Sequence, residues 1–241
     1  GAIVMVSSNH FVSTVLGLET LSMSLYGMIA YPLRSAKSAK FPLEASVKYL
    51  VLSATASGFI LFGMALIYAQ TGTLSFTSVT ALPAVGLGDA YTIVALLMVV
   101  SGMVFKLSLA PFHMWTPDVY EGAPLPATAY LATIAKAAMF VVLLRFVQIS
   151  EALNFDSIVI VFTLIAAASM LAGNLLALLQ DNLKRILAYS SIAHMGYLLL
   201  ALIAGHYVTG TIAVETISFY LIAYVIMSLG AFGIASVSYT H

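Results

Sequence analysis

The sequence predicts an all-α protein whose helices cross a lipid bilayer several times. Of its 241 residues, 62% are hydrophobic and only 7% are charged, against roughly 25% charged residues in a soluble domain. The apolar residues form long runs, and a membrane-spanning helix needs about 20 of them. Strands of a membrane barrel would alternate apolar and polar residues in segments of about ten, whereas the run at 158–171 is apolar on every face. A polytopic transmembrane helix bundle is therefore the expected fold.

Seven apolar runs, each bounded by Pro, Gly or charged residues, predict the spans in order. They cover residues 11–31, 43–69, 91–110, 127–147, 158–179, 186–203 and 212–236. The first six residues form an apolar stretch that is too short for a span or a signal peptide and looks like the tail of a preceding helix. Because the chain also lacks an initiator Met, we expect it to be an internal fragment of a longer protein.

Positive charges in the short connections predict the orientation, because Lys and Arg are retained on the cytoplasmic side. Arg34, Lys37 and Lys40 lie in the first connection, and Lys184 and Arg185 precede the sixth span. If all seven spans cross, both connections lie on one face of the membrane. We expect a multi-pass protein of a bacterial inner membrane, with an organelle membrane as the alternative.

Charge and composition exclude several function classes. Nine basic and nine acidic residues give a net charge of zero, so no basic surface is available for nucleic acid. Cysteine is absent, which removes disulfides, thiolate-bound zinc, iron–sulfur ligation and thiol catalysis. No two histidines have metal-ligand spacing on one helix face, and no Gly-rich phosphate loop follows a strand. We therefore expect neither a bound cofactor nor hydrolytic chemistry in this chain.

Three ionisable residues, Glu19, Lys106 and Lys136, lie well inside predicted spans. A charge at the centre of a membrane helix costs roughly 2.5–3.5 kcal/mol on insertion scales, so these side chains must face protein, water or each other. Glu19 shares a polar stripe with Ser22 and Tyr26, at i, i+3 and i+7, which favours a wet interior face. Its carboxylate is either half of a structural ion pair or a member of a proton pathway.

Lys136 follows the start of its predicted span by nine residues, or about 14 Å along a helix, which places it near the middle of the membrane. Burial destabilises the charged form of a lysine there, and an approaching carboxylate stabilises it again. Such a residue is a switchable proton site.

Lys106 lies four residues before the end of its predicted span, and the alternative for it is to snorkel to the interface. Pro111 argues for a deeper position, because proline lacks a backbone N–H and clashes with the preceding turn, so the helix should break near 108–112. Interrupted helices line the ion sites of transporters. We expect the break to face the helices of the other two charged residues, and the connection at 111–126 to form a loop.

Two histidines lie near predicted spans. Ser191, His194 and Tyr197 share one helix face at three-residue spacing, so His194 is either hydrogen-bonded between helices or a member of a proton relay. His113, beside Trp115 at the end of a span, is expected to anchor at the interface or in the loop.

Three motifs carry a resemblance to a known family. They are FKLSLAPFHMWTPDVYEGAP at 105–124, DNLKRILAYSS at 181–191 and LEASVKY at 43–49. With these motifs the sequence resembles the antiporter-like membrane subunits of proton-pumping NADH:quinone oxidoreductase, respiratory complex I. Within that group, the stretch at 116–124 is most similar to subunit N, whereas the sister subunits L and M usually have Leu-Pro-Asp-Ala-His.

The resemblance implies about fourteen transmembrane helices in two inverted five-helix repeats with flanking helices. Residues 1–148 would supply the end of helix four through helix eight, and residues 149–241 would supply helices nine to eleven. The family's glutamate on helix five corresponds to Glu19, and its lysines on helices seven and eight correspond to Lys106 and Lys136. Its lysine on helix twelve has no counterpart in this chain.

On this resemblance the chain is a proton-translocating subunit, while other subunits, its expected partners, bind NADH, flavin, iron–sulfur clusters and quinone. His194 and Lys184 are further candidates for proton transfer. One alternative is a subunit of a multisubunit sodium/proton antiporter or membrane-bound hydrogenase. The sequence around Asp118, which is most similar to subunit N, argues against this alternative. Another is a structural membrane scaffold, for which neutral replacement of Glu19 or Lys136 would leave pumping intact.

Overall fold

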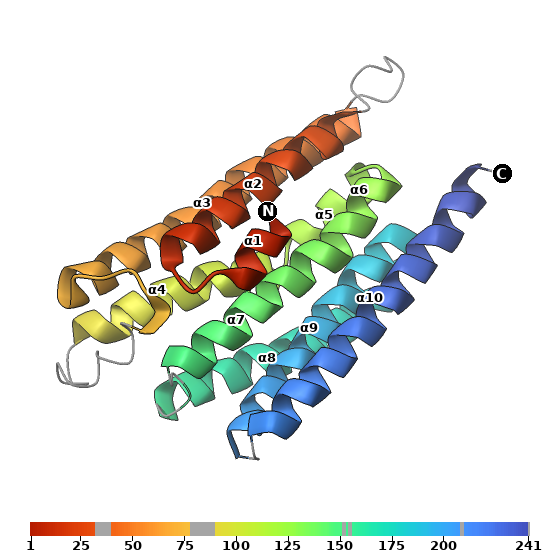
Figure 1. Cartoon of the computed structure of the whole chain (residues 1–241). Helices are drawn as coiled ribbons and strands as arrows, with labels where there is room; N and C mark the ends of the chain where they lie inside the picture. Colours follow the sequence, from red (N-terminus) through yellow and green to blue (C-terminus); the bar gives the residue numbers. More distant parts are fainter. Residues whose placement is uncertain (32–39, 78–89, 151–152, 154–155, 208–209, 241) are drawn as a thin grey trace.

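The computed structural model is a bundle of helices that run roughly along one common direction (Figure 1). It describes residues 1–31, 40–77, 90–150, 153, 156–207 and 210–240. In these parts the elements are α1 (Ala2–Ser7), α2 (Phe11–Ala30), α3 (Lys40–Thr71), α4 (Ala90–Lys106), α5 (Trp115–Gly122), α6 (Leu125–Tyr130), a π-helical turn (Leu131–Ala135), α7 (Lys136–Ser150), α8 (Asp156–Ala177), α9 (Leu183–Tyr207) and α10 (Gly210–Thr240).

Six segments of the described chain are long and apolar enough to cross a membrane. They are Phe11–Ala30, Phe41–Thr71, Leu125–Ser150, Asp156–Ala177, Leu183–Tyr207 and Ile212–Val237. The third predicted span, 91–110, corresponds to α4, which has 17 residues and is apolar but shorter than these six. The predicted all-α polytopic bundle is thus confirmed.

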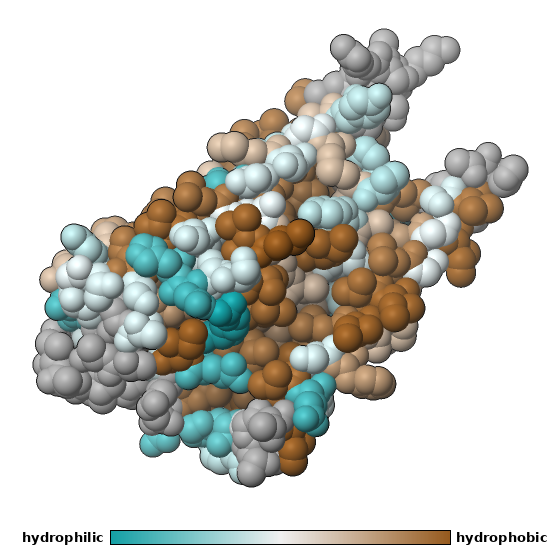
Figure 2. All heavy atoms as spheres, viewed as in Figure 1, coloured by the Kyte–Doolittle hydropathy of each residue, from teal (hydrophilic) through white to brown (hydrophobic). Residues whose placement is uncertain are grey.

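Apolar side chains cover much of the outside of this bundle. Figure 2 shows them over the middle of one face, with hydrophilic side chains gathered toward one end. On α10, Phe219 and Ile234 are 77% and 75% exposed, and Ile222 and Ile226 are exposed as well. Contiguous apolar surface of this extent is rare on soluble monomers. This surface faces lipid, and the chain is an integral membrane protein.

Close backbone approach holds α3 against α4 and α5. A Cβ on Gly102 of α4 would lie 2.6 Å from the carbonyl oxygen of Ala56, and a Cβ on Gly122 of α5 would lie 2.7 Å from that of Phe41. Glycine is therefore needed for these helices to pack at this distance. Since the contacts move toward the start of α3 as the chain advances, α4 and α5 together form one interrupted crossing antiparallel to α3.

The interruption of this crossing lies where Pro111 predicted it. α4 ends at Lys106, and the chain then forms turns up to the start of α5, with Ser108 at φ 61°. The backbone N–H of Ala110 donates a hydrogen bond to Ser169 Oγ on α8 at 2.8 Å. Protein atoms thus satisfy part of the backbone that the break releases in the apolar interior.

The expectation of a loop over 111–126 is wrong, because this stretch contains α5 and the first residues of α6. Pro117 and the acidic residues of the stretch are typical of loops when they are considered alone. However, α5 packs against α3 and α9, and its Val119 and Tyr120 are both 0% exposed. Pro117 stands in the first turn of α5, where a missing N–H costs little, so tertiary packing stabilises a short helix here.

Candidate functional site

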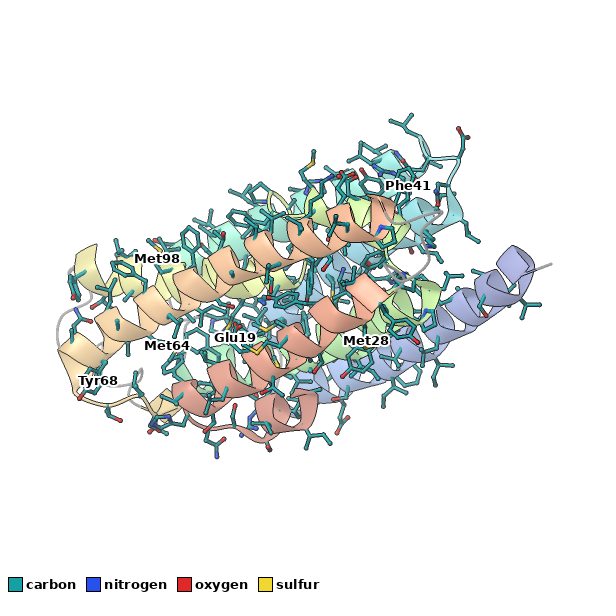
Figure 3. The ribbon with its side chains drawn as sticks, turned by 90° about the horizontal axis from the view of Figure 1, so that it is seen from above. Glu19, Met28, Phe41, Met64, Tyr68 and Met98 are labelled. Carbon is teal, nitrogen blue, oxygen red and sulfur yellow. The ribbon has the colours of Figure 1, made fainter. Side chains whose placement is uncertain are left out.

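Glu19 lies on α2 and faces α3. Ser57 Oγ on α3 donates a hydrogen bond to Glu19 Oε1 at 2.5 Å, and Figure 3 shows Glu19 in the space between the two helices. Ser22, one turn further along α2, is fully buried. The interior face predicted from the polar stripe is therefore confirmed.

Lys106 reaches the same surface of α3 from the end of α4. Its Nζ donates to Ser22 Oγ at 3.0 Å and also to Ser53 Oγ. Ser53 precedes Ser57 by four residues, which is about one helical turn, so the carboxylate and the ammonium are bound to neighbouring serines of one helix. They interact electrostatically, but no ion pair found in the described chain includes either of them.

The position of Lys106 excludes the interfacial alternative. Gly102, one turn earlier on α4, lies against Ala56 near the middle of α3, and the Lys106 side chain points inward to Ser53. Ending α4 at this lysine also places its ammonium at a helix C-terminus, where the helix dipole favours positive charge. The break thus provides a site for a cation inside the bundle.

Lys136 begins α7 and is only 1% exposed. Its Nζ donates to Ser191 Oγ on α9 at 2.8 Å and lies 5.7 Å from the centre of the Tyr120 ring. The Ser191 hydroxyl in turn donates a hydrogen bond to the carbonyl oxygen of Ala188 at 2.8 Å. Within the described residues, no carboxylate lies at ion-pair distance from this ammonium.

His194 lies close to this lysine site. Its Nδ1 is 2.6 Å from the Tyr220 hydroxyl oxygen on α10, and its ring centre is 5.3 Å from that of Tyr224. One of the two alternatives for His194, a hydrogen bond between helices, is therefore present in the structure. Tyr197 shares the predicted face, and its ring centre lies 5.9 Å from that of His194, while its hydroxyl accepts a hydrogen bond from Asn174 on α8 at 2.9 Å.

A cavity of about 20 Å³ connects the two lysine sites, and both Lys106 and Lys136 line it. Ser22 and Trp115 also contribute to its wall, which is otherwise largely apolar. A cavity needs about 10–15 Å³ to hold a water molecule, so this one has room for about one. Lys106 and Trp115, which flank the break, thus face α2 and α7 across this cavity, whereas Ala110 within the break bonds α8.

Buried polar groups without a hydrogen-bond partner concentrate in the break and α5. Among the described side chains they belong to Ser108, His113, Trp115, Thr116 and Tyr120. His113 lies in the turns between α4 and α5, as the loop alternative predicted, but it is buried at 8% exposure, so the expected place at the interface is wrong. Buried polar groups that lack protein partners are normally satisfied by ordered water in folded proteins.

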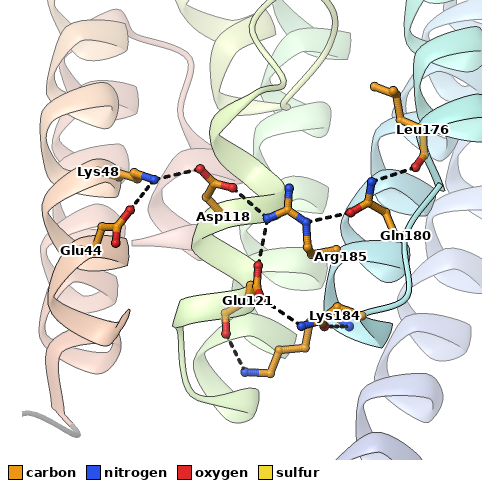
Figure 4. A network of polar contacts seen from close by, with 9 residues as sticks. Glu44, Lys48, Asp118, Glu121, Leu176, Gln180, Lys184 and Arg185 are labelled. Carbon is orange, nitrogen blue, oxygen red and sulfur yellow. Dashed lines mark hydrogen bonds and ion pairs between the residues drawn. The ribbon is translucent and has the colours of Figure 1, made fainter. Parts of the chain in front are cut away.

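An ionic network joins α3, α5 and α9 near one end of the bundle (Figure 4). Asp118 of α5 lies 2.9 Å from both Lys48 and Arg185, and Arg185 also lies 2.9 Å from Glu121. Lys48 follows the first connection, and Arg185 precedes the sixth predicted span. These two connections were expected on the same face of the membrane, and both residues bind Asp118 of α5. Arg34 and Lys37, which contribute to the predicted orientation, lie outside the described residues.

Lys184 lies beside this network and not beside the buried lysines. Its Nζ donates to the carbonyl oxygens of Glu121 and Ala123 at 3.1 and 2.8 Å. Lysine side chains commonly satisfy the last carbonyls of a helix in this way. Its contacts are therefore those of a cap on the C-terminal end of α5.

The structure adds polar partners that the sequence analysis did not single out. They are Ser53 and Ser57 beside Lys106 and Glu19, Tyr120 beside Lys136, and Tyr224 beside His194. The i, i+4 spacing of the two serines within a long apolar helix is a signal that was available in the sequence. The tyrosines carry no such signal, because Tyr120 comes from the stretch expected to be a loop.

Comparison with known proteins gives a consistent result. The chain matches, over residues 8–241, the family model described as NADH:quinone oxidoreductase/Mrp antiporter, TM. It is 50% identical over 236 residues to NADH-quinone oxidoreductase subunit N of Methylococcus capsulatus and 52% identical over 240 residues to the protein of the same name from Ectopseudomonas mendocina. These alignments cover 98% and 100% of the chain but 47% of each relative. The chain therefore spans about half the length of these curated relatives.

Solved structures show the same fold. A chain of respiratory complex I from Thermus thermophilus has a TM-score of 0.78 and 38% identity, over 98% of this chain and 48% of that one. The archaeal membrane-bound sulfane sulfur reductase has a TM-score of 0.81 and 28% identity, over 96% and 46%. The Mrp complex from Dietzia sp. has a TM-score of 0.81 at 23% identity, over 93% and 40%, and shares the fold.

Proposed function

We propose, because this chain belongs to the NADH:quinone oxidoreductase/Mrp antiporter transmembrane family, that it carries part of a proton path across a bacterial inner membrane. In this proposal it is a segment of subunit N of a proton-translocating NADH:quinone oxidoreductase, the name borne by its relatives. Other subunits of the complex are its partners and bind NADH, flavin, iron–sulfur clusters and quinone. The chain itself carries out no redox step.

The single observation that carries the proposal is the environment of Lys136. This lysine is buried inside a membrane protein and has one neutral hydrogen-bond acceptor, Ser191. Ionisable residues inside a membrane are expensive and mark ion or proton pathways. Without a fixed counter-charge, the balance between the charged and neutral forms of such a lysine responds to any charge that approaches it. A group of this kind can load and release a proton.

The other buried charges supply a path to Lys136. Glu19 and Lys106 are bound to serines one turn apart without forming an ion pair. Two unit charges at about 4 Å interact by about 4 kcal/mol at an effective dielectric of 20, and more weakly at the larger separation of this pair. A small movement of the carboxylate therefore changes how strongly Lys106 holds its proton. The cavity between the lysines offers room for a bridging water, and His194 offers a continuation beyond Lys136.

In this proposal, residues 1–148 hold most of one half-path, which contains the buried Lys136 and the partly buried Glu19 and Lys106. Residues 149–241 belong to the second half and contribute Ser191 and His194 to the first. Lys184 stands apart from the path, and its contacts support a structural role.

Replacement of Lys136 by methionine in the full-length subunit tests the proposal. The assembled complex is reconstituted into vesicles, and the number of protons moved per NADH oxidised is measured. We expect this ratio to fall, because methionine keeps most of the side-chain volume but cannot hold a proton. Asn174→Leu is the matched control, since it also replaces a polar residue inside a span, at an exposed position of α8.

An unchanged proton ratio in an assembled Lys136→Met complex would contradict the proposal and favour a structural scaffold. Movement of protons driven by a sodium gradient without NADH would instead favour a sodium/proton antiporter. Each outcome requires that the complex assembles, which is checked by its yield and its NADH oxidation.

A further inference from the structure

A buried tyrosine of α10 contacts the backbone immediately before Lys136. Tyr224 is 1% exposed, and its hydroxyl donates a hydrogen bond to the carbonyl oxygen of Ala132 at 2.8 Å. Ala132 belongs to the π-helical turn Leu131–Ala135, and Lys136 is the next residue. The two bonded residues are 92 positions apart, so this contact is a product of helix packing.

The π turn determines the direction in which Lys136 points. In a π turn the backbone bonds run from i to i+5, so it accommodates one more residue than an α-turn and rotates the following residues around the helix axis. In a regular α-helix, the Lys136 side chain would leave the axis in another direction and lose its alignment with Ser191. Such turns occur mostly as single interruptions of α-helices, frequently at functional sites.

We propose that Tyr224 is a positioning residue for Lys136. Its hydroxyl holds the carbonyl of Ala132 and thereby maintains the π turn that directs the lysine Nζ at Ser191. This inference rests on the proposed function, since it concerns the geometry of the same proton site. In this inference α10 affects the orientation of Lys136 through the backbone of the π turn and not by direct contact with the lysine side chain.

The groups around the lysine are consistent with this indirect action. Among the described residues, the polar and charged groups that face Lys136 directly are Tyr120 of α5 and Ser191 and His194 of α9. Across the small cavity lie Lys106 of α4, Ser22 of α2, Tyr49 of α3 and Trp115 of α5. Tyr224 lies beside them, but its hydrogen bond goes to the backbone of the π turn. Removal of its hydroxyl therefore leaves every direct partner of the lysine in the protein.

Tyr224→Phe in the full-length subunit, within the assembled and reconstituted complex, tests the inference. We expect the rate of proton pumping to fall about three- to tenfold, which corresponds to the loss of one buried hydrogen bond. We also expect the pH profile of pumping to move, because the lysine changes its surroundings. Thr216→Val is the matched control, since it removes from α10 a hydroxyl that bonds the carbonyl of Ile212 on the exposed side.

A double-mutant cycle with Ser191→Ala separates positioning from a general effect on packing. If Tyr224 acts by directing Lys136 at Ser191, its hydroxyl matters less once the serine hydroxyl is gone, so the two losses in pumping will not add. Additive losses, or an unchanged pH profile in Tyr224→Phe, would overturn the inference. Failure of Tyr224→Phe to assemble would also overturn it, because the hydroxyl would then serve folding.

Lys136→Met in the same vesicles distinguishes this inference from the proposed function. If Lys136→Met pumps normally, the proposed function fails. If it does not pump but Tyr224→Phe behaves like Thr216→Val, only the positioning role fails.

Discussion

Lys136 and Ser191 form a buried hydrogen bond of 2.8 Å between α7 and α9, although they are 55 residues apart in the chain. In the proposed function the lysine belongs to the first repeat and the serine to the second. The surroundings of this proposed proton site would then depend on packing between both parts, and changes in either part are expected to alter it.

Replacement of Ser53 by alanine removes an acceptor from the Lys106 ammonium. A hydrogen bond to a charged group contributes about 1.5–3 kcal/mol, so we expect proton pumping by the reconstituted complex to fall by about tenfold or more. Thr55→Val is the control, because Thr55 lies two residues away on α3 with its hydroxyl on the exposed side. Equal pumping by the two variants would show that Ser53 has no part in the path.

Replacement of Gly102 by alanine tests the close approach of α3 and α4. The added Cβ would lie 2.6 Å from the carbonyl oxygen of Ala56, and overpacking of this kind typically costs about 1–3 kcal/mol. We expect a lower Tm of the purified complex and weaker pumping, since α4 carries Lys106. Gly58→Ala on α3 meets no atom within 4 Å and should be neutral or slightly stabilising, because alanine favours helix. A neutral Gly102→Ala would contradict this packing.

Replacement of Arg185 by methionine breaks its ion pairs with Asp118 and Glu121. These side chains are partly exposed, and such pairs contribute about 0.2–1 kcal/mol each. We therefore expect a fall in Tm that shrinks as salt is added, because salt screens exposed charges. A fall that is independent of salt concentration would indicate that the side chain acts by packing.

Replacement of Lys184 by methionine tests its role as a helix cap. The change removes two hydrogen bonds to the carbonyls at the end of α5, so thermal unfolding should occur at a lower temperature. The number of protons moved per NADH oxidised by the assembled complex should stay the same. A lower ratio without loss of stability would instead place Lys184 in the proton path.

The charged residues of the candidate site were predictable because a charge inside a membrane has a high free-energy cost. A buried charge is so unfavourable in a membrane that Glu19, Lys106 and Lys136 stand out without any structure, and the lack of an N–H in Pro111 predicts the break after Lys106. The helical nature of α5 was not predictable in this way. An eight-residue helix is marginal on its own, and this one depends on its burial between α3 and α9.

By itself, the sequence determined that this protein is a multi-span helical membrane protein, where its charges enter the membrane and where one crossing is interrupted. These properties follow from local apolar runs and from single residues whose burial or geometry is costly. Only the tertiary structure decided which groups meet these charges. Ser57, Ser53 and Ser191 lie 38, 53 and 55 residues from their charged partners. Such pairs are set by which helix faces pack together, and periodicity along one helix carries no information on its neighbour.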